Sequence, residues 1–174
     1  MKIALGVTGG VAAYKAAELV RRLQQEKLDV QVVMTRGARE FITPLTFAAI
    51  TGKKVITEMF GAEESGPANV ESAIEHIAVA QRIDALVVAP ATANTLAKMA
   101  RGAADDFLTT LYLATTAPLI VAPAMNVNMW EHAATQENIA TLRARGVHVD
   151  YAGFDVANFL SSRGMEKHVG IFVV

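Results

Sequence analysis

The sequence has 174 residues, of which 52% are hydrophobic and 19% are charged, and its formal net charge is −1. This balance is typical of a soluble globular domain, and it argues against nucleic acid or an anionic membrane as the main partner. No apolar run reaches the roughly 18 residues of a membrane helix. Glycines interrupt the apolar N-terminus, which argues against a signal peptide, so we expect a cytoplasmic protein. The absence of cysteine excludes disulfides and thiolate metal sites.

Strand and helix patterns alternate along the chain. Strands are predicted at 2–7, 29–35, 53–57, 84–90, 117–123 and 147–152. Helices are predicted at 9–27, 39–52 (in pieces broken at Pro44), 70–82, 92–102, 104–116 and 132–146, with a loop at 59–69. Continuous apolar strands between helices are typical of a parallel sheet covered on both faces. We therefore predict an α/β fold: a Rossmann-like, doubly wound parallel sheet with helices on both faces.

Four predicted strand ends carry unusual residues. They are TGG at 8–10, TRG at 35–37, PATANT at 90–95 and PAMNVNMW at 123–130. In a doubly wound sheet, ligands bind outside the carboxyl ends of the strands, near the point where the strand order reverses. The four segments therefore predict a binding site along one edge of the sheet.

The first two segments limit the choice of ligand. Gly9 and Gly10 allow the backbone to approach a ligand, and the helix start behind them favours an anion such as phosphate, although a tight turn would use the same glycines. The spacing is not G-x-G-x-x-G, and Thr35 and Arg36 stand where an NAD site needs an acidic residue. NAD is disfavoured. Arg36 suits an NADP phosphate, whereas Thr35 and the amides after it suit a mononucleotide phosphate equally well.

The last two segments carry polar groups. Thr92, Asn94 and Thr95 exceed what helix capping needs, and an isoalloxazine ring would use several such donors and acceptors. Asn126 either caps a short helix or holds a polar ligand, and it can do both. For Asn128 the capping alternative stays open.

The remaining titratable residues give weaker signals. His76 lies to one side of the apolar face of its helix, so it is predicted to be solvated unless a neighbouring subunit covers it and makes it a proton-transfer group. Asp105 and Asp106 are predicted to be first-turn helix charges rather than an acid–base pair. We expect no metal site, because no ligand spacing links the other histidines, His132, His148 and His168.

Together these stretches resemble the flavin-dependent cysteine decarboxylases, from residue 2 to about residue 149. The family motif Pro-x-Ser-Ala-Asn-Thr is matched by residues 90–95, with Thr92 replacing the serine. The motif Pro-x-Met-Asn-x-x-Met-Trp is complete at residues 123–130, and the family's catalytic His-Ile pair falls on His76 and Ile77. The branch that the chain resembles most decarboxylates phosphopantothenoylcysteine (PPC) in coenzyme A synthesis.

The resemblance implies a Rossmann-like flavoprotein with FMN as its cofactor and with named site residues. FMN would contact Gly9, Gly10, Val11, Thr35, Thr92, Ala93, Asn94, Thr95 and Ala124. His76 would act as the base, Asn126 would orient the substrate carboxylate, and Met129 and Trp130 would complete the substrate pocket. The family assembles as homotrimers or multiples of trimers with sites between subunits, which would cover His76.

The implied chemistry accounts for the amide at the fourth strand end. Loss of CO2 needs an electron sink, which oxidation of the cysteine thiol to a thioaldehyde by the flavin would supply. A strong ion pair to the departing carboxylate would stabilise the ground state most, whereas Asn126 can orient it without that penalty. Trp130 would help to exclude water.

The chain departs from the resemblance after residue 150. We divide it into a flavoprotein decarboxylase domain at 1–150 and an atypical tail at 151–174, because the tail lacks the cysteine that protonates the enethiol intermediate in the coenzyme A branch. The alternatives are a reaction that stops at the enethiol, as in the peptidyl-cysteine decarboxylases, an altered tail on an ordinary enzyme, or a non-catalytic, regulatory flavin-binding protein. Flavin prenyltransferases share the fold and cofactor but lack the Asn-x-x-Met-Trp element, and an NADP-linked reductase ranks lower still.

Overall fold

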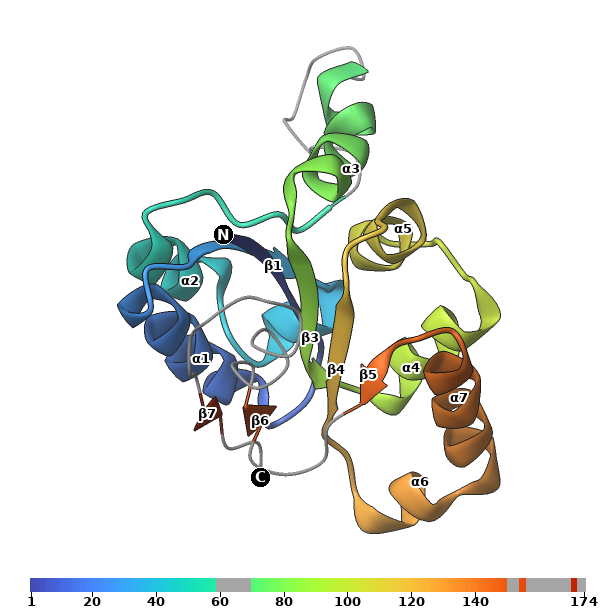
Figure 1. The fold of residues 1–174 in the computed structure, drawn as a ribbon. Helices are drawn as coiled ribbons and strands as arrows, with labels where there is room; N and C mark the ends of the chain where they lie inside the picture. The colour runs from blue at the N-terminus through green and yellow to red at the C-terminus, as the bar shows by residue number, and fades with distance from the viewer. Residues whose placement is uncertain (59–69, 150–153, 156–169, 172–174) are drawn as a thin grey trace.

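The sheet is built from parallel strands at the centre of the molecule. The computed structural model describes residues 1–58, 70–149, 154–155 and 170–171. Five strands form one sheet in the order β2-β1-β3-β4-β5, with every pairing parallel (Figure 1). Their bounds are β1 Lys2–Val7, β2 Asp29–Met34, β3 Ala85–Ala91, β4 Leu119–Pro123 and β5 His148–Val149. The strand order reverses between β1 and β3, which confirms the doubly wound prediction.

Helices cover both faces of this sheet. α1 and α2 lie on one face, and α3, α4, α5 and α7 lie on the other (Figure 1). Their bounds are α1 Ala13–Gln25, α2 Pro44–Thr51, α3 Val70–Arg82, α4 Ala93–Arg101, α5 Phe107–Ala114, α6 Val127–Glu131 and α7 Ala133–Ala144, with the 3-10 helix η1 at Arg36–Glu40. A further antiparallel pair joins β6, Phe154–Asp155, to β7, Gly170–Ile171.

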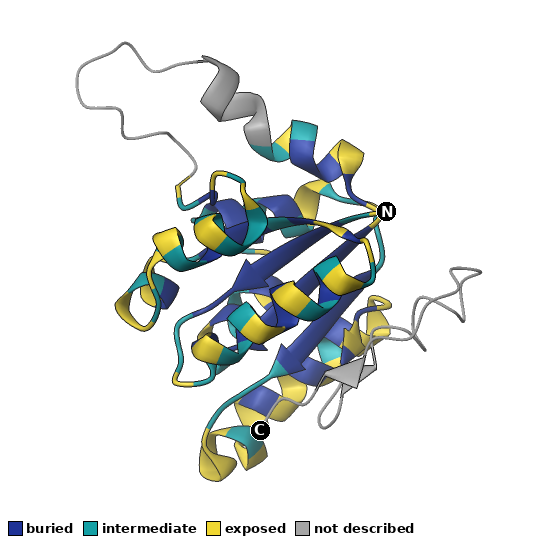
Figure 2. Cartoon of the chain, turned by 90° about the vertical axis from the view of Figure 1, so that its left-hand side faces the viewer, coloured by how far each residue is buried: buried dark blue, intermediate teal, exposed yellow. Residues whose placement is uncertain are grey.

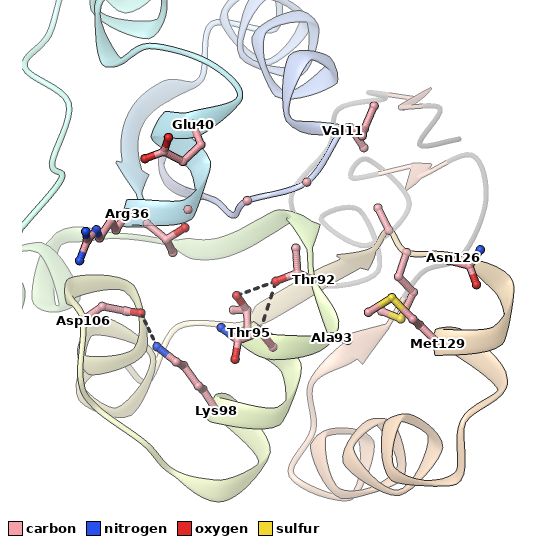
Figure 3. Close-up of a pocket in the computed structure, with 18 of the residues that line it drawn as sticks. Val11, Arg36, Glu40, Thr92, Ala93, Thr95, Lys98, Asp106, Asn126 and Met129 are labelled. Atoms are coloured by element: carbon pink, nitrogen blue, oxygen red, sulfur yellow. Dashed lines mark hydrogen bonds and ion pairs between the residues drawn. The ribbon is translucent and has the colours of Figure 1, made fainter.

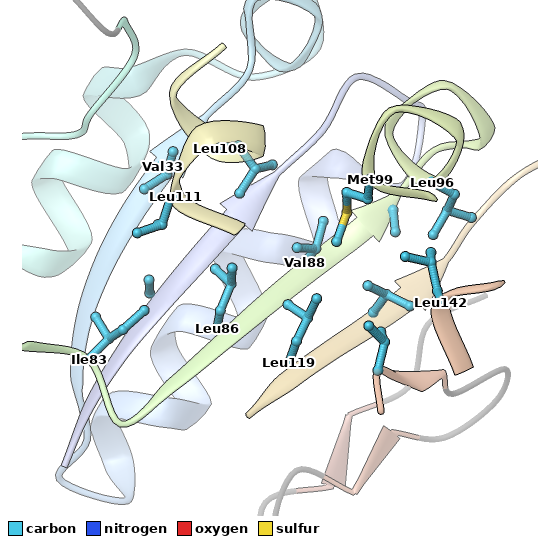
Figure 4. Close-up of a cluster of buried hydrophobic side chains, with 14 of the residues drawn as sticks. Val33, Ile83, Leu86, Val88, Leu96, Met99, Leu108, Leu111, Leu119 and Leu142 are labelled. Atoms are coloured by element: carbon cyan, nitrogen blue, oxygen red, sulfur yellow. The ribbon is translucent and has the colours of Figure 1, made fainter. Parts of the chain in front are cut away.

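Alternate residues of the central strands feed two hydrophobic clusters. Figure 2 shows the buried strands inside helices whose outer faces are exposed. In β3, Val87 points toward the α1 side, whereas Leu86 and Val88 belong to the cluster beneath α4, α5 and α7 (Figure 4). A strand buried on both faces needs apolar residues at every position, which explains the continuous apolar runs in the sequence.

Some elements differ from the sequence prediction at their ends. The helix predicted at 9–27 begins only at Ala13, so residues 8–12 remain as a loop. The strand predicted at 53–57 contributes a single bridge, between Val33 and Ile56. The segment predicted as helical pieces broken at Pro44 does form two pieces: η1 ends at Glu40 and α2 begins at Pro44, because proline suits the first helical position. Residues 59–69 and 150–152 lie outside the described residues, and the division at 150 stays a prediction.

Candidate functional site

A cavity of about 1160 Å³ lies at the carboxyl edge of the sheet (Figure 3). Its lining comes from all four predicted strand ends. The lining residues are 9–12, 14, 15, 35–37, 40, 92–95, 98, 105, 106, 124–126 and 129. The structure therefore brings together Gly9, Gly10, Val11, Thr35, Thr92, Ala93, Asn94, Thr95, Ala124, Asn126 and Met129, as the sequence predicted.

A buried threonine fixes two of these strand ends to each other. The Thr8 hydroxyl is fully buried and donates to the Pro90 carbonyl oxygen at 2.6 Å. The Thr8 hydroxyl oxygen in turn accepts the Thr92 backbone N–H at 3.0 Å. Both bonds join Thr8, directly after β1, to residues at the end of β3 and the start of α4. They therefore hold the loop after β1 at a fixed distance from the start of α4.

Residues 8–12, which we call the glycine loop, approach the loop after β2 very closely. A Cβ placed on Gly9 would lie 2.6 Å from both the carbonyl carbon and the carbonyl oxygen of Gly37. A Cβ on Gly10 would meet only the Thr92 methyl, at an ordinary 3.6 Å. Gly9 is therefore required by the packing of two backbones, whereas the space in front of Gly10 is left for the cavity.

Two helices begin at the cavity. Residues 9–12 lead into α1, and Thr92 is the N-cap of α4, where its hydroxyl accepts the Thr95 amide at 3.4 Å. The Thr92 and Thr95 hydroxyls are 3.1 Å apart. Helix N-termini present unpaired N–H groups and partial positive charge, so this part of the wall favours an anionic or acceptor-rich ligand.

Asn126 caps a helix and also lines the cavity. It is the N-cap of α6, and its Oδ1 accepts the Asn128 amide at 2.8 Å. Because the cap occupies the oxygen, the Nδ2 amino group remains as the donor that Asn126 can offer to a ligand in the cavity (Figure 3). Asn128 supplies the backbone N–H of this cap rather than a cap of its own.

Trp130 lies beside the hydrophobic core rather than in the cavity lining. It does not line the cavity; its side chain packs, partly buried, against the cluster beneath α4 and α7. A role for Trp130 in shaping the substrate pocket would therefore act through the position of α6. Direct contact with the substrate stays a prediction.

A lysine and two aspartates form part of the wall that the sequence did not predict. Lys98 Nζ lies 2.8 Å from both carboxylate oxygens of Asp105 and 3.3 Å from Asp106 (Figure 3). The hydrogen bond to Asp105 raises the pKa of Lys98, and the same bond lowers the pKa of Asp105. With one ammonium group against two carboxylates, this cluster leaves a net negative charge at this part of the cavity wall.

The prediction that both aspartates belong to a first helical turn is wrong. Asp106 is the N-cap of α5, in a capping box with Thr109, and Asp105 precedes it. The Asp-x-x-Thr spacing was the available signal for this cap. Gly102, which ends α4 in a left-handed conformation, turns the chain so that the aspartates return to Lys98.

Two further basic side chains line the cavity. Lys15 lies 5.3 Å from the centre of the Tyr14 ring, and Arg36 stands at the start of η1. Among the described residues, neither has a carboxylate within ion-pair distance. They supply positive charge near the glycine loop, where Glu40 is the carboxylate that also lines the cavity. Of the two, only Arg36 was a candidate from the sequence.

His76 lies outside the cavity lining, on α3. The expectation that it is simply solvated is wrong, because the residue is half-buried and its Nδ1 atom is buried without a hydrogen-bond partner. Its ring packs edge-on against Phe107, with centroids 6.4 Å apart. Within one chain, His76 therefore does not belong to the cavity, and the two do not form a single site.

Comparisons with known proteins agree with this geometry. The Flavoprotein family model matches residues 1–160. The chain belongs to the Flavoprotein family. It is 51% identical over 148 residues to the coenzyme A biosynthesis bifunctional protein CoaBC of Vibrio vulnificus, which covers 85% of this chain and 35% of that protein. The chain thus spans about a third of the length of the curated relatives that it matches.

Two solved structures share the fold and also more than a quarter of their aligned residues with this chain. The FMN-dependent cysteine decarboxylase SpaF superposes with a TM-score of 0.77 at 34% identity, covering 87% of this chain and 83% of SpaF. A PPC decarboxylase variant complexed with pantothenoylaminoethenethiol gives a TM-score of 0.70 at 28% identity, covering 99% and 91%. The family and these neighbours support a flavin as the cofactor.

The cavity's own features fit a flavin that carries a phosphate. Helix N-termini and the Lys15 and Arg36 cations suit a phosphate, the space in front of Gly10 admits a close ligand, and the cavity lies beside the switch point between β1 and β3. Among the described residues, no group of three or more His, Asp or Glu side chains could hold a metal ion. No helix in the same part of the chain is long and apolar enough to cross a membrane.

Proposed function

We propose that this chain catalyses the FMN-dependent oxidative decarboxylation of the cysteine moiety of PPC, in coenzyme A biosynthesis. The observation that carries the proposal is the geometry of Asn126. Its side-chain oxygen is engaged in a helix cap, so its amino group is left for a ligand. It lines the same cavity as the loops at Gly9, Thr35 and Thr92. The similarity to CoaBC and to PPC decarboxylase gives the substrate class.

FMN would be held by three segments of the cavity. Residues 9–11 and Thr35 would surround the phosphate, with Lys15 and Arg36 adding positive charge. Residues 92–95 and Ala124 would bind the ring system through hydroxyl, amide and backbone groups. When bound, FMN supplies hydride acceptance, which provides the electron sink that decarboxylation needs.

The protein's own groups would then orient the substrate and move its protons. The Asn126 amino group would donate to the substrate carboxylate and hold it without a full ion pair, so that the ground state is not overstabilised. Met129, half-exposed at the cavity wall, would pack against the apolar part of the substrate. His76 would accept the proton that leaves the cysteine side chain.

His76 reaches a substrate only if the protein is oligomeric. We propose a cytoplasmic homotrimer, or a multiple of trimers, in which α3 of one subunit completes the cavity of another. The supporting observations are that His76 does not line its own cavity and that exposed apolar side chains, Val11 and Tyr14, stand at the cavity rim with 79% and 59% exposure.

The second candidate is a peptidyl-cysteine decarboxylase. It is favoured by the superposition on SpaF and by the absence of cysteine in this chain, because the coenzyme A branch uses a cysteine to protonate the enethiol. A regulatory flavin-binding role is the third candidate.

Parallel turnover assays separate these candidates. The purified protein is denatured to identify the released flavin, and the native protein is incubated with PPC, with pantothenoylcysteine and with a peptide that ends in cysteine. We expect FMN to be released, CO2 from PPC, and at least tenfold lower kcat/KM for the peptide. Peptide turnover that exceeds PPC turnover supports the second candidate, and FMN without any CO2 supports the third.

A further inference from the structure

The two ring nitrogens of His76 have different surroundings. Nδ1 is buried and makes no hydrogen bond, although the residue as a whole is only half-buried. Nε2 makes no hydrogen bond to a described residue either, yet it is not a buried atom, so solvent reaches it. A buried polar atom without a partner is uncommon and calls for a physical explanation. The described ring contact of this histidine suggests one.

Phe107 is the aromatic neighbour of this imidazole. The two rings meet at 86° with their centroids 6.4 Å apart, which is an edge-to-face pair, and Phe107 is only 2% exposed. Such pairs orient the smaller ring as well as burying it. The ring of His76 is therefore held by an apolar contact rather than by the carboxylate or carbonyl that usually fixes a functional histidine.

Phe107 is itself held in place from the cavity side. It is the first residue of α5, directly after the Asp106 N-cap, whose carboxylate accepts the Thr109 amide at 2.8 Å. The other oxygen of Asp106 lies 3.3 Å from Lys98 Nζ. A continuous set of contacts thus runs from the cavity wall through the start of α5 to the imidazole on α3.

We propose that Phe107 is a positioning residue for His76: it seals Nδ1 and leaves Nε2 as the nitrogen that exchanges a proton with the substrate. The inference rests on the proposed role of His76 as the base. It assigns the proton transfer to one atom and explains the unpartnered Nδ1, because a hydrogen-bonding partner at that nitrogen is replaced by a phenyl ring.

Alkylation of the holoenzyme with iodoacetamide tests the inference. The chain has no cysteine to compete for the reagent, and the Nδ1 and Nε2 adducts of histidine are separable after digestion. The variants are Phe107→Leu and, as a matched control, Phe47→Leu, because Phe47 is also fully buried but belongs to the cluster on the other face of the sheet.

We expect wild type and Phe47→Leu to carry the adduct at Nε2 of His76 alone, and Phe107→Leu to carry it at both nitrogens. We also expect kcat on PPC to fall about tenfold in Phe107→Leu with KM changed less than twofold. An Nδ1 adduct in wild type, no adduct at His76, or the same single adduct in both variants would overturn the inference. If Phe107→Leu does not fold, the position of the adduct on His76 of the wild type tests the inference: an Nε2 adduct alone supports it, and an Nδ1 adduct overturns it.

The chemical readout does not depend on turnover. If no substrate is decarboxylated but Phe107→Leu opens Nδ1, the proposed function fails and the orientation of His76 by Phe107 stands. If PPC is decarboxylated and the adduct pattern ignores Phe107, the function stands and this inference fails.

Discussion

Adding a methyl group at Gly9 and at Gly10 in turn should separate an effect on packing from an effect on ligand binding, because the two glycines have different surroundings. In Gly9→Ala the new Cβ would lie 2.6 Å from two backbone atoms of Gly37. Neither atom belongs to a flexible side chain, so the loop after β1 or the start of η1 must shift. Overpacking of this kind costs about 1–3 kcal/mol. We therefore expect Gly9→Ala to lower both the stability of the apoprotein and its affinity for FMN.

The matched variant is Gly10→Ala, whose Cβ meets only the Thr92 methyl at 3.6 Å. We expect the free energy of unfolding of this variant to stay within about 0.5 kcal/mol of wild type, which is usual where no packing is disturbed. Its FMN affinity should still fall, because the methyl group occupies the space in front of the loop. The two variants thus differ in stability and agree in the direction of the affinity change.

Thermal unfolding of the apoproteins and fluorescence titration with FMN measure the two effects. A loss of 1–3 kcal/mol corresponds to a decrease in Tm of about 2–12 °C for a chain of this size. An unchanged Tm in Gly9→Ala would refute the steric reasoning. Gly10→Ala that binds FMN as tightly as wild type would refute the assignment of this loop to the cofactor.

Three other predictions follow from single contacts. Thr8→Val should lower the unfolding free energy by about 1–3 kcal/mol in denaturant titration, because the buried Pro90 carbonyl and the amide opposite it lose their partner; an isostable variant would contradict this. Asn126→Asp keeps the cap oxygen but replaces the donor with a negative charge, so turnover of PPC should fall more than tenfold with FMN affinity unchanged; full activity would contradict it. Lys98→Gln should cost well under about 1 kcal/mol at neutral pH, because the ion pair is largely exposed. The lowered pKa of Asp105 gives stability that is present above 3.8 and is lost as pH falls through the folded pKa. The raised pKa of Lys98 gives stability that is present below 10.5 and is lost as pH rises through the folded pKa. A difference from wild type that does not shrink as pH falls below 3.8 would contradict the assignment.

The sequence was sufficient for the sheet and for most of the cavity. Strands buried on both faces must be apolar at every position, so the sheet could be predicted from the apolar runs. The carboxyl ends of parallel strands share one edge, so the loops at Gly9, Thr35, Thr92 and Asn126 could be placed together from the sequence alone. The helix cap at Asn126 could be stated as an alternative but not resolved, because the orientation of an amide depends on the cap geometry.

Other features depend on tertiary contacts that leave no local pattern. Lys98 and Asp105 meet because Gly102 reverses the chain between two helices, and sequence spacing alone does not show that turn closing on the cavity. The ring contact of His76 is made with Phe107, from a helix about 30 residues away in the sequence. The place of Trp130 depends on how α6 leans on the core.

The most direct test of the proposed decarboxylation is one anaerobic turnover. The purified FMN-loaded protein is mixed with PPC while CO2 and the absorbance of oxidised flavin are followed together. We expect CO2 in an amount equal to the flavin, with loss of the oxidised flavin absorbance in the same phase; any later return of that absorbance measures whether another group replaces the absent cysteine. FMN that stays oxidised with no CO2 released would contradict the proposed function.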